Sequence, residues 1–544
     1  MHHCLYFYPL MKSKLFRLSY PTWLHAENLF FASVLVLAAG LPTSNSLMSW
    51  GQFGMAAAWL WDTNWKNKLS RLKEHLPLLL FASIYLIYLF GMIHTSDWQE
   101  GLRQLRIKLP ILIIPIMATS FPILPSSRWN QLLHVLLGAI LLTAIYGLFK
   151  HTGLIDNPNF EFRKLSPFIS NIRFATLLVF GIFTCLYLFS KEGSSYRILP
   201  NTLYLILAIM FVTYLLLLKS LTGIYILFFT GITTGFVLSI KKSNKYFSYS
   251  LLFMCVLIVW GGVRIWKFEY DRYHIKEKID FSHLPLSTPK GSIYKHDTLS
   301  QITENGYYVW LYISYHELRK TWNERSQIPF DGITQKGYPI KETLIHFLSS
   351  KGLKKDEEGV KKLTNSEIKA IESGINNVIF MNKYSIGSRI YEIIRELDHY
   401  RITGDATGKS SALRLELWRH AWMKIKQQPL IGYGTGDLTN ELTHAYIRTQ
   451  TPLHPAYWYH PHNQYLSTAL STGIPSVFLL ILLIINPLFL KRKIIIPLFW
   501  LSVLIVLLAM IDEDTLTTQA GATQVAFLYV FMYLSPGLLQ NHES

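Results

Sequence analysis

The chain has 544 residues, of which 50% are hydrophobic and 16% charged, and its mean hydropathy is +0.24. This composition is too apolar for a water-soluble multidomain protein and predicts an all-α polytopic membrane protein. The net charge of +18 is spread over many short loops, which is typical of membrane topology and argues against a nucleic-acid-binding surface.

Apolar runs long enough to cross roughly 30 Å of hydrocarbon predict about twelve transmembrane helices. The first run follows several basic residues and could be read as a signal peptide, but the many spans behind it favour a retained anchor. The runs define an N-terminal membrane domain (1–266), a large loop domain (267–465) between helices 9 and 10, and a C-terminal membrane domain (466–544). In chain order they are 28–41, 46–61, 76–94, 107–123, 132–149, 168–189, 199–218, 223–240, 247–266, 466–490, 494–511 and 520–539.

The distribution of lysine and arginine among the short loops predicts the orientation. If the N-terminus is cytoplasmic, the inner loops contain basic groups at 66–73, 241–245 and 491–493, and these outnumber the cations of the outer loops. Both termini are therefore expected inside, and the long loop outside. Of the three cysteines, none lies in that loop, so no disulfide framework is implied.

The long loop is polar, with turn signals at 329–332 and 336–339 and short amphipathic helices expected at 341–348 and 365–372. A solvated cap is the simplest interpretation of this part. Its last third predicts a helix from about 412 to 427 that presents Arg414 beside Trp418, one turn later. The glycine-rich segment 432–437 then predicts a tight turn, and with Arg414 it would provide a phosphate-binding context.

Two histidines stand where the loop meets the tenth predicted span, in the cluster His460-Pro461-His462-Asn463. A neutral histidine at the outer surface can accept a proton near pH 7, as a hydroxyl acceptor attacking an activated sugar requires. Alternatively, His462 is an interfacial residue at the start of a helix, and the same holds for His460.

A lipid-linked pyrophosphate donor requires stabilisation of its departing negative charge, by a metal held on carboxylates or by Arg and Lys. The only outer carboxylates at metal-ligand spacing are Asp512, Glu513 and Asp514, which could also form a solvated turn. A metal-free site is the simpler interpretation, although Arg173 could snorkel, Lys219 could be an ordinary anchor and Arg414 a surface cation. The candidate cations are Arg173, Lys219, Arg389, Arg395 and Arg414.

These motifs resemble the O-antigen ligase and polymerase superfamily, integral membrane glycosyltransferases of the C-type fold. The matching segments are Arg414 with Trp418, the run 428–436, and His462-Asn463 followed by Gly473. The family signature departs at its last position, which is Ser476 here. Residues 513–516 and 519–521 also resemble a run in one branch of these ligases, without an assigned role.

The resemblance implies that His462 is the catalytic base and that Arg414 contacts the donor pyrophosphate, with Asn463 and Trp418 among the substrate-binding residues. A second family arginine follows a serine at the start of a span. Here that run reads Lys219-Ser220-Leu221-Thr222-Gly223, so Leu221 occupies the arginine position. Lys219 could substitute as a point charge without a bidentate fork, or Arg173 could reach the same place.

The leading hypothesis is an inverting, metal-independent and cofactor-free ligase in the bacterial inner membrane. It would move a glycan from undecaprenyl pyrophosphate to a hydroxyl of the lipid A core at the periplasmic face. The alternatives are an O-antigen polymerase, a protein-glycosylating relative, and a lipid-linked sugar transporter. A transporter usually has its polar residues at the bilayer midplane, whereas most candidates here lie at the outer boundary or in the loop.

Overall fold

The computed structural model of the protein describes residues 25–152, 154, 165–190, 200–242, 245–274, 277–382, 385–489 and 497–536. The described residues are mostly helical, as predicted, and divide into two compact units. The first comprises the described residues of Met1–Thr234, Trp418–Ala445 and Tyr459–Ser544, and the second those of Gly235–Leu417 and Tyr446–Trp458. The basic residues before the first apolar run and the inner group predicted at 491–493 lie outside the described residues.

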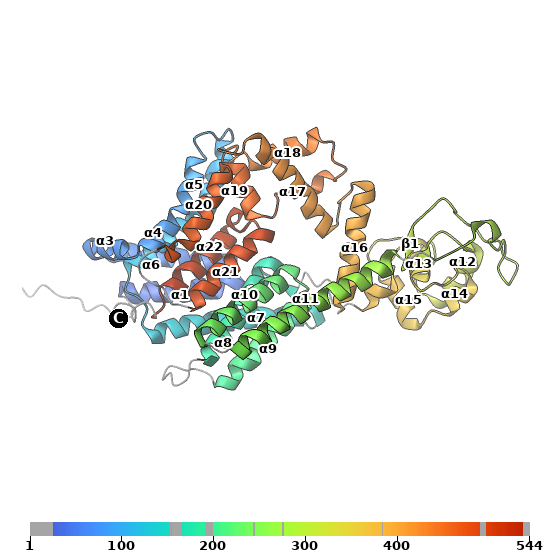
Figure 1. Ribbon diagram of the computed structural model, residues 1–544, viewed down its shortest axis with the longest axis horizontal. Coiled ribbons are helices and arrows are strands. Elements are labelled where there is room, and N and C mark those ends of the chain that lie inside the picture. The colour runs from blue at the N-terminus through green and yellow to red at the C-terminus, as the bar shows by residue number, and fades with distance from the viewer. Residues whose placement is uncertain are drawn as a thin grey trace, which may run out of the picture. The chain divides into compact units, whose positions relative to one another are not determined.

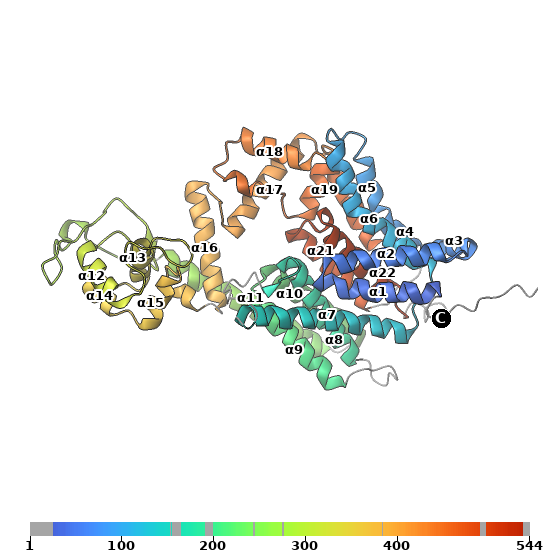
Figure 2. The ribbon, with the colours of Figure 1, turned by 180° about the vertical axis from the view of Figure 1, so that it is seen from behind.

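The first unit is a helical bundle around α22, whose residues from Gly521 to Tyr533 are all buried. This helix packs along α6, and α1 lies beside α2 and α7 (Figure 2). The helices of this unit, labelled in Figure 1, are α1 (Ala26–Thr43), α2 (Asn45–Trp61), α3 (Trp65–Glu74), α4 (Leu76–Ala82), α5 (Ile84–Phe90), α6 (Trp98–Ser120), α7 (Ser126–Thr152), α8 (Asn171–Ser190), α9 (Asn201–Leu217), most of α10 (Leu221–Lys242), α19 (Gln464–Thr472), α20 (Ile474–Ile485), α21 (Pro497–Asp512) and α22 (Gln519–Tyr533). Three-residue 3₁₀ turns follow α20 and α21, at Asn486–Leu488 and Thr515–Thr517.

Most apolar runs form the predicted helices, but two predicted spans are wrong in detail. The run 76–94 is two short helices, α4 and α5, separated at Ser83, and α5 ends at Phe90. The run 466–490 is interrupted at Gly473, where α19 ends and α20 begins. Gly473 has φ +87°, a backbone conformation that ends a helix and that glycine adopts without strain. Hydrophobicity detects both runs but not these breaks.

Three of the described helices, α1, α7 and α8, are long and apolar enough to cross a membrane. The bent pair of α3 with α4–α5 would add a fourth, and α9, α10, α20 and α21 contribute shorter apolar segments. Large apolar side chains on α9 and α20 are exposed, for example Ile209 and Phe478, as expected for contact with lipid. The structure therefore supports an all-α membrane protein, while the count of twelve spans stays a prediction.

The second unit contains a small core of its own between α11 (Lys245–His274) and α16 (Ile386–Thr403) in the chain. Trp322, Phe330 and Phe347 are fully buried in it. The amphipathic helices expected at 341–348 and 365–372 are present as α13 and α15. The helices of this core are α12 (Tyr315–Arg325), α13 (Ile340–Ser350), α14 (Glu357–Lys361) and α15 (Asn365–Glu372), with 3₁₀ turns at Phe281–His283 and Val378–Met381. Two further helices, α17 (Ser410–Gln427) and α18 (Leu438–Arg448), run across the boundaries of the units, and a 3₁₀ turn lies at Pro455–Tyr457.

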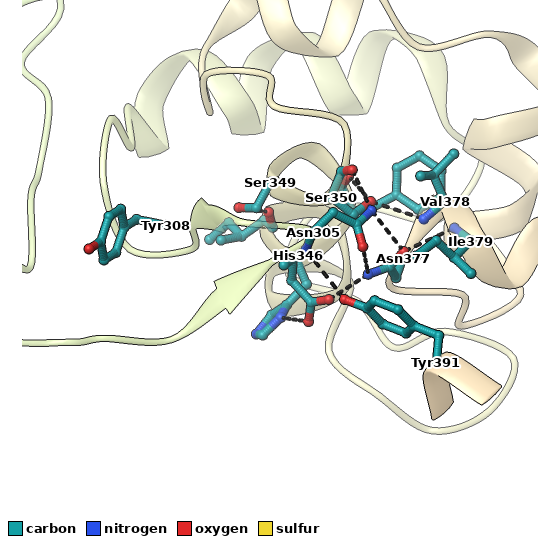
Figure 3. A network of polar contacts seen from close by, with 12 residues as sticks. Asn305, Tyr308, His346, Ser349, Ser350, Asn377, Val378, Ile379 and Tyr391 are labelled. Atoms are coloured by element: carbon teal, nitrogen blue, oxygen red, sulfur yellow. Dashed lines mark hydrogen bonds and ion pairs between the residues drawn. The ribbon is translucent and has the colours of Figure 1, made fainter. Parts of the chain in front are cut away.

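A buried polar network organises the hairpin of β1 (Thr303–Glu304) and β2 (Tyr307–Tyr308), shown in Figure 3. Asn305 and Gly306 turn the hairpin with φ of 52° and 92°. Asn377 Nδ2 donates to Glu304 Oε2 at 2.5 Å, and His346 Nδ1 lies 2.9 Å from Glu304 Oε1. Asn305 Nδ2 donates to Ser350 O at 2.7 Å. Each of these groups makes its hydrogen bonds within the second unit, so the network stabilises the hairpin.

Candidate active site

One buried carboxylate holds the backbone of the histidine cluster. Asp514, between α21 and α22, is only 5% exposed. Its Oδ2 accepts a hydrogen bond from the backbone nitrogen of His462 at 2.9 Å, and its Oδ1 accepts one from that of Asn463 at 3.0 Å. The Ser467 hydroxyl, one turn into α19, also donates to Oδ1 at 2.6 Å. A carboxylate that receives three donors in a dry site fixes these residues firmly to the end of the bundle.

The backbone of His462 is left-handed, with φ 50°. This region is uncommon for residues other than glycine, and the two amide bonds to Asp514 offset its cost. The imidazole is half-buried, with its ring centroid 6.1 Å from that of Tyr459 in an edge-on arrangement. Asn463 caps α19, because its Oδ1 accepts from the Leu466 amide at 3.0 Å. The predicted substrate-binding role of Asn463 would therefore fall to its amide nitrogen.

Two further side chains fasten the cluster. Trp418 Nε1 donates to the carbonyl oxygen of Pro461 at 2.7 Å, and His460 Nε2 lies 2.9 Å from the Thr439 hydroxyl on α18. Burial lowers the pKa of His460 and raises the pKa of Asp514, because both charged forms lose water, while their mutual attraction opposes both shifts. His460 and Trp418 thus position the segment that carries His462.

Arg173 lies beside the run Asp512-Glu513-Asp514, called here the acidic turn. On the first turn of α8, its Nε donates to Ser170 Oγ at 3.0 Å and lies 3.9 Å from Glu513 Oε1. Arg173 and Glu513 line a small cleft with Thr176, Val506, Thr515 and Gln524, among others. The predicted contact of Arg173 with the donor pyrophosphate stays a prediction.

The loop that contains Lys219 contacts the acidic turn through Thr222. It stands between α9 and α10 with φ 51°, and Ser220 Oγ accepts from the Gly223 amide at 3.2 Å. Thr222 Oγ1 donates to Asp512 Oδ2 at 2.9 Å. Leu221, where the resemblance implies an arginine, begins α10 and is 41% exposed. The loop of Lys219 is therefore held on Asp512.

Arg414 lies on α17, one turn before Trp418, and is half-buried. The boundary between the two compact units falls between these residues, so Arg414 belongs to the second unit and Trp418 to the first. The structure thus brings His462, Asn463, Trp418, Arg173 and Lys219 together in one unit around the acidic turn, and the part of Arg414 in the same site stays a prediction.

Residues 370–481 match a family model described as O-Antigen ligase. This match supports membership of the chain in the O-antigen ligase superfamily. A curated relative is an uncharacterized protein of Haemophilus influenzae, which is 26% identical over 154 residues. That alignment covers 28% of this chain and spans 37% of the relative's length.

The region matched to the O-antigen ligase family contains Arg414, Trp418 and His462-Asn463, but not the buried carboxylate of Asp514 that holds the His462 backbone. Asp514, Arg173 and Lys219 all lie outside 370–481. Asp514 contacts the cluster, Arg173 lies near Glu513, and the loop of Lys219 contacts Asp512 through Thr222. The acidic turn was singled out in the sequence without a role. In the structure Asp514 is buried, Asp512 and Glu513 are half-buried, and each of the three contacts a different segment.

The glycine-rich turn of the family region has a packing role. The amides of Tyr433 and Gly434 donate to Leu470 and Ser471 at 2.9 Å, and that of Thr435 donates to Gly91 at 3.1 Å. A Cβ at Gly473 would lie 2.0 Å from the Leu430 carbonyl oxygen. Backbone carbonyls already use these three amides, and the phosphate-binding context expected of the turn together with Arg414 stays a prediction.

Sequence reasoning missed Lys108, on α6 within the predicted span 107–123. It is 3% exposed, and its Nζ donates to Gln104 Oε1 at 2.8 Å and lies 4.6 Å from the ring centroid of Tyr88. The hydroxyl of Tyr88 lies 2.9 Å from that of Thr468 on α19, and Lys108 is attracted electrostatically to Asp514. The sequence contained a signal for Lys108, because an ionisable residue inside an apolar span indicates a functional site by default.

No group of three or more His, Cys, Asp or Glu side chains within the described ranges could hold a metal ion. The metal independence expected from the sequence stays a prediction.

Proposed function

We propose that this protein is a membrane glycosyltransferase of the O-antigen ligase type. It transfers a glycan from undecaprenyl pyrophosphate to a hydroxyl of the lipid A core, at the periplasmic face of the inner membrane. The observation that carries the proposal is the placement of His462, whose backbone is held on the buried Asp514 within the region matched to the family. Such a fixed imidazole is what proton abstraction from an acceptor hydroxyl requires.

The proposed reaction is one displacement at the anomeric carbon. His462 accepts the proton of the acceptor hydroxyl while its oxygen forms the new glycosidic bond. The bond between the anomeric carbon and the pyrophosphate oxygen breaks on the opposite face, and the configuration inverts. The leaving undecaprenyl pyrophosphate keeps the bonding electrons, and its charge is stabilised by Arg414 with Arg173 or Lys219.

The first test replaces His462 with alanine in the full chain. We expect loss of the polysaccharide ladder on lipopolysaccharide, and a drop of at least about a hundredfold in transfer by purified protein, as general bases typically contribute. His444→Ala is the matched control, because this exposed histidine lies on α18 beyond Thr439, the residue of that helix that contacts His460. A normal ladder in a folded His462→Ala protein would overturn the assignment.

A polymerase that joins repeat units uses the same site chemistry, and deletion separates the two activities. A polymerase mutant still attaches one repeat unit to the core, whereas a ligase mutant attaches none. In vitro transfer from a defined undecaprenyl-pyrophosphate donor should be measured with a lipid A core acceptor, a second donor molecule and a secreted-protein acceptor. Transfer in detergent, without a second compartment, would exclude transport as the primary activity.

A further inference from the structure

The short helix α3 departs sharply from the spans that flank it. It follows α2 after three residues, and Asn64 Oδ1 accepts from the Asn67 amide at its start. The axis of α3 is bent by 89° from that of the following α4–α5 segment. The α4–α5 segment lies within the predicted span 76–94, and if that segment crosses the membrane, a helix at a right angle to it runs along the membrane surface.

Two basic residues fasten α3 to the ends of the bundle helices. Lys68 is 4% exposed, and its Nζ donates to the carbonyl oxygens of Trp59 and Asp62. The same ammonium lies 4.3 Å from the ring centroid of Trp65. Arg71 Nη1 donates to the carbonyl oxygen of Ser120, the last residue of α6, at 3.2 Å. The orientation of α3 is therefore set by the fold.

The rest of α3 faces outward with an ordered pattern. Trp65 and Leu69, one turn apart, are 52% and 56% exposed, and together they form an apolar stripe. Lys66 and Lys73, two turns apart, are also exposed and flank this stripe on one side. Exposed apolar side chains bordered by lysines suit the boundary between acyl chains and anionic headgroups.

The surface of α3 lies at the opposite end of α6 from the candidate active site. Before the first residue of α6, the amides of Ser96 and Asp97 donate to Asp437, in the turn that packs on α19. The 23 residues of α6 span roughly 33 Å at 1.5 Å per residue, about the thickness of the hydrocarbon core. Since α6 contains the predicted span 107–123, its two ends are expected to meet different membrane surfaces.

We propose that α3 lies in the headgroup region of the leaflet opposite the candidate active site and binds anionic phospholipid through Lys66 and Lys73. Trp65 and Leu69 enter the upper acyl region, and the two ammonium groups contact the phosphates above it. The proposal rests on the membrane location of the bundle and not on the proposed glycan transfer. Lipid binding by α3 and glycan transfer can therefore each fail without the other.

The test measures which lipid lies next to α3 in the full chain. Ser70→Cys, at an exposed position of α3, is labelled with bimane in a protein whose native cysteines have been replaced. The protein is reconstituted into phosphatidylcholine vesicles. Quenching by nitroxide-labelled phosphatidylglycerol is then compared with quenching by nitroxide-labelled phosphatidylcholine, which gives a relative association constant for the anionic headgroup.

We expect phosphatidylglycerol to be preferred, by about fivefold per lysine at low salt, and the preference to vanish near 1 M salt. Lys66→Gln with Lys73→Gln should remove it. The matched control, Lys320→Gln with Lys336→Gln, removes the same charge from exposed lysines of the second unit and should leave it unchanged. Equal quenching by both lipids, or a preference that survives the Lys66/Lys73 change, would overturn headgroup binding. Absence of quenching by either lipid would show that α3 does not lie on the membrane.

Discussion

At the scale of single residues, the site depends on side chains that hold other residues. Asp514 touches the backbone of His462 and Asn463, Trp418 holds Pro461, and His460 meets Thr439. Each of these groups is remote in sequence from at least one partner. Their common effect is to fix the backbone that carries the His462 imidazole, so their replacement should alter turnover more than acceptor binding.

Asp514→Asn should lower kcat by about ten- to a hundredfold with a smaller change in KM, because the amide cannot accept from all three donors and the His462 segment shifts. Steady-state transfer kinetics of the folded protein measure this split. Asp512→Asn is the control, since Asp512 accepts from Thr222 and not from the cluster. Unchanged kcat in Asp514→Asn would show that the carboxylate is a structural brace only.

Lys108→Met tests whether the buried lysine compensates the charge of Asp514. Each single change leaves a buried charge without its counter-charge, whereas the double change with Asp514→Asn removes both. We expect the double variant to lose less thermal stability than the sum of the two single losses, by about 1 kcal/mol or more. Strict additivity in a double-mutant cycle would show that the two groups are uncoupled.

At the scale of elements, the break between α19 and α20 shows how a helix boundary shapes the site. The break at Gly473 lets Leu430 approach α19, and the glycine-rich turn pairs with the last residues of that helix. The first turn of α19 carries Asn463 and Ser467, so the break and the Asp514 contacts locate the helix at both ends.

Gly473→Ala should destabilise the protein by more than about 2 kcal/mol, because its φ of +87° is unfavourable for alanine and the Cβ would meet the Leu430 carbonyl. Thermal unfolding in detergent, followed by size-exclusion chromatography, measures the loss. Gly138→Ala on α7 is the control, since a Cβ there has no atom within 4 Å. A melting temperature of Gly473→Ala equal to that of the control would contradict the assigned packing.

At the scale of the whole molecule, the chain comprises two compact units with separate cores, and the family-matched region 370–481 contributes to both. The second unit contains a buried lysine, Lys355, that is 3% exposed and donates to the Tyr308 carbonyl oxygen at 2.7 Å. Burial lowers its pKa from 10.5 to about 8, against the attraction of Glu277 and Asp356.

The stability of the second unit should therefore rise as the pH increases from about 8 to about 10. In that range the unfolded lysine keeps a proton that the folded lysine has released, so the unfolded state binds more protons. Over this pH range, the release of the Lys355 proton raises the free energy of unfolding by about 2 kcal/mol. The measurement is the difference in thermal stability between the native chain and Lys355→Met at each pH, which removes the effect of titrating tyrosines. If the difference in thermal stability between the two proteins stays constant with pH, the lowered pKa of Lys355 is refuted.

The sequence by itself determined the helical membrane class, the family region and the candidate base, because these depend on local hydrophobicity and on short motifs. His462, Gly473 and Arg414 could all be identified from their spacing. The sequence could not determine where α4–α5 and α19–α20 break, nor that Asp514 and Lys108 flank the histidine cluster. Those relations join residues tens to hundreds of positions apart, and they exist only once the helices pack. Only the tertiary structure decided them, because the partner of a buried charge is chosen by what lies beside it in space.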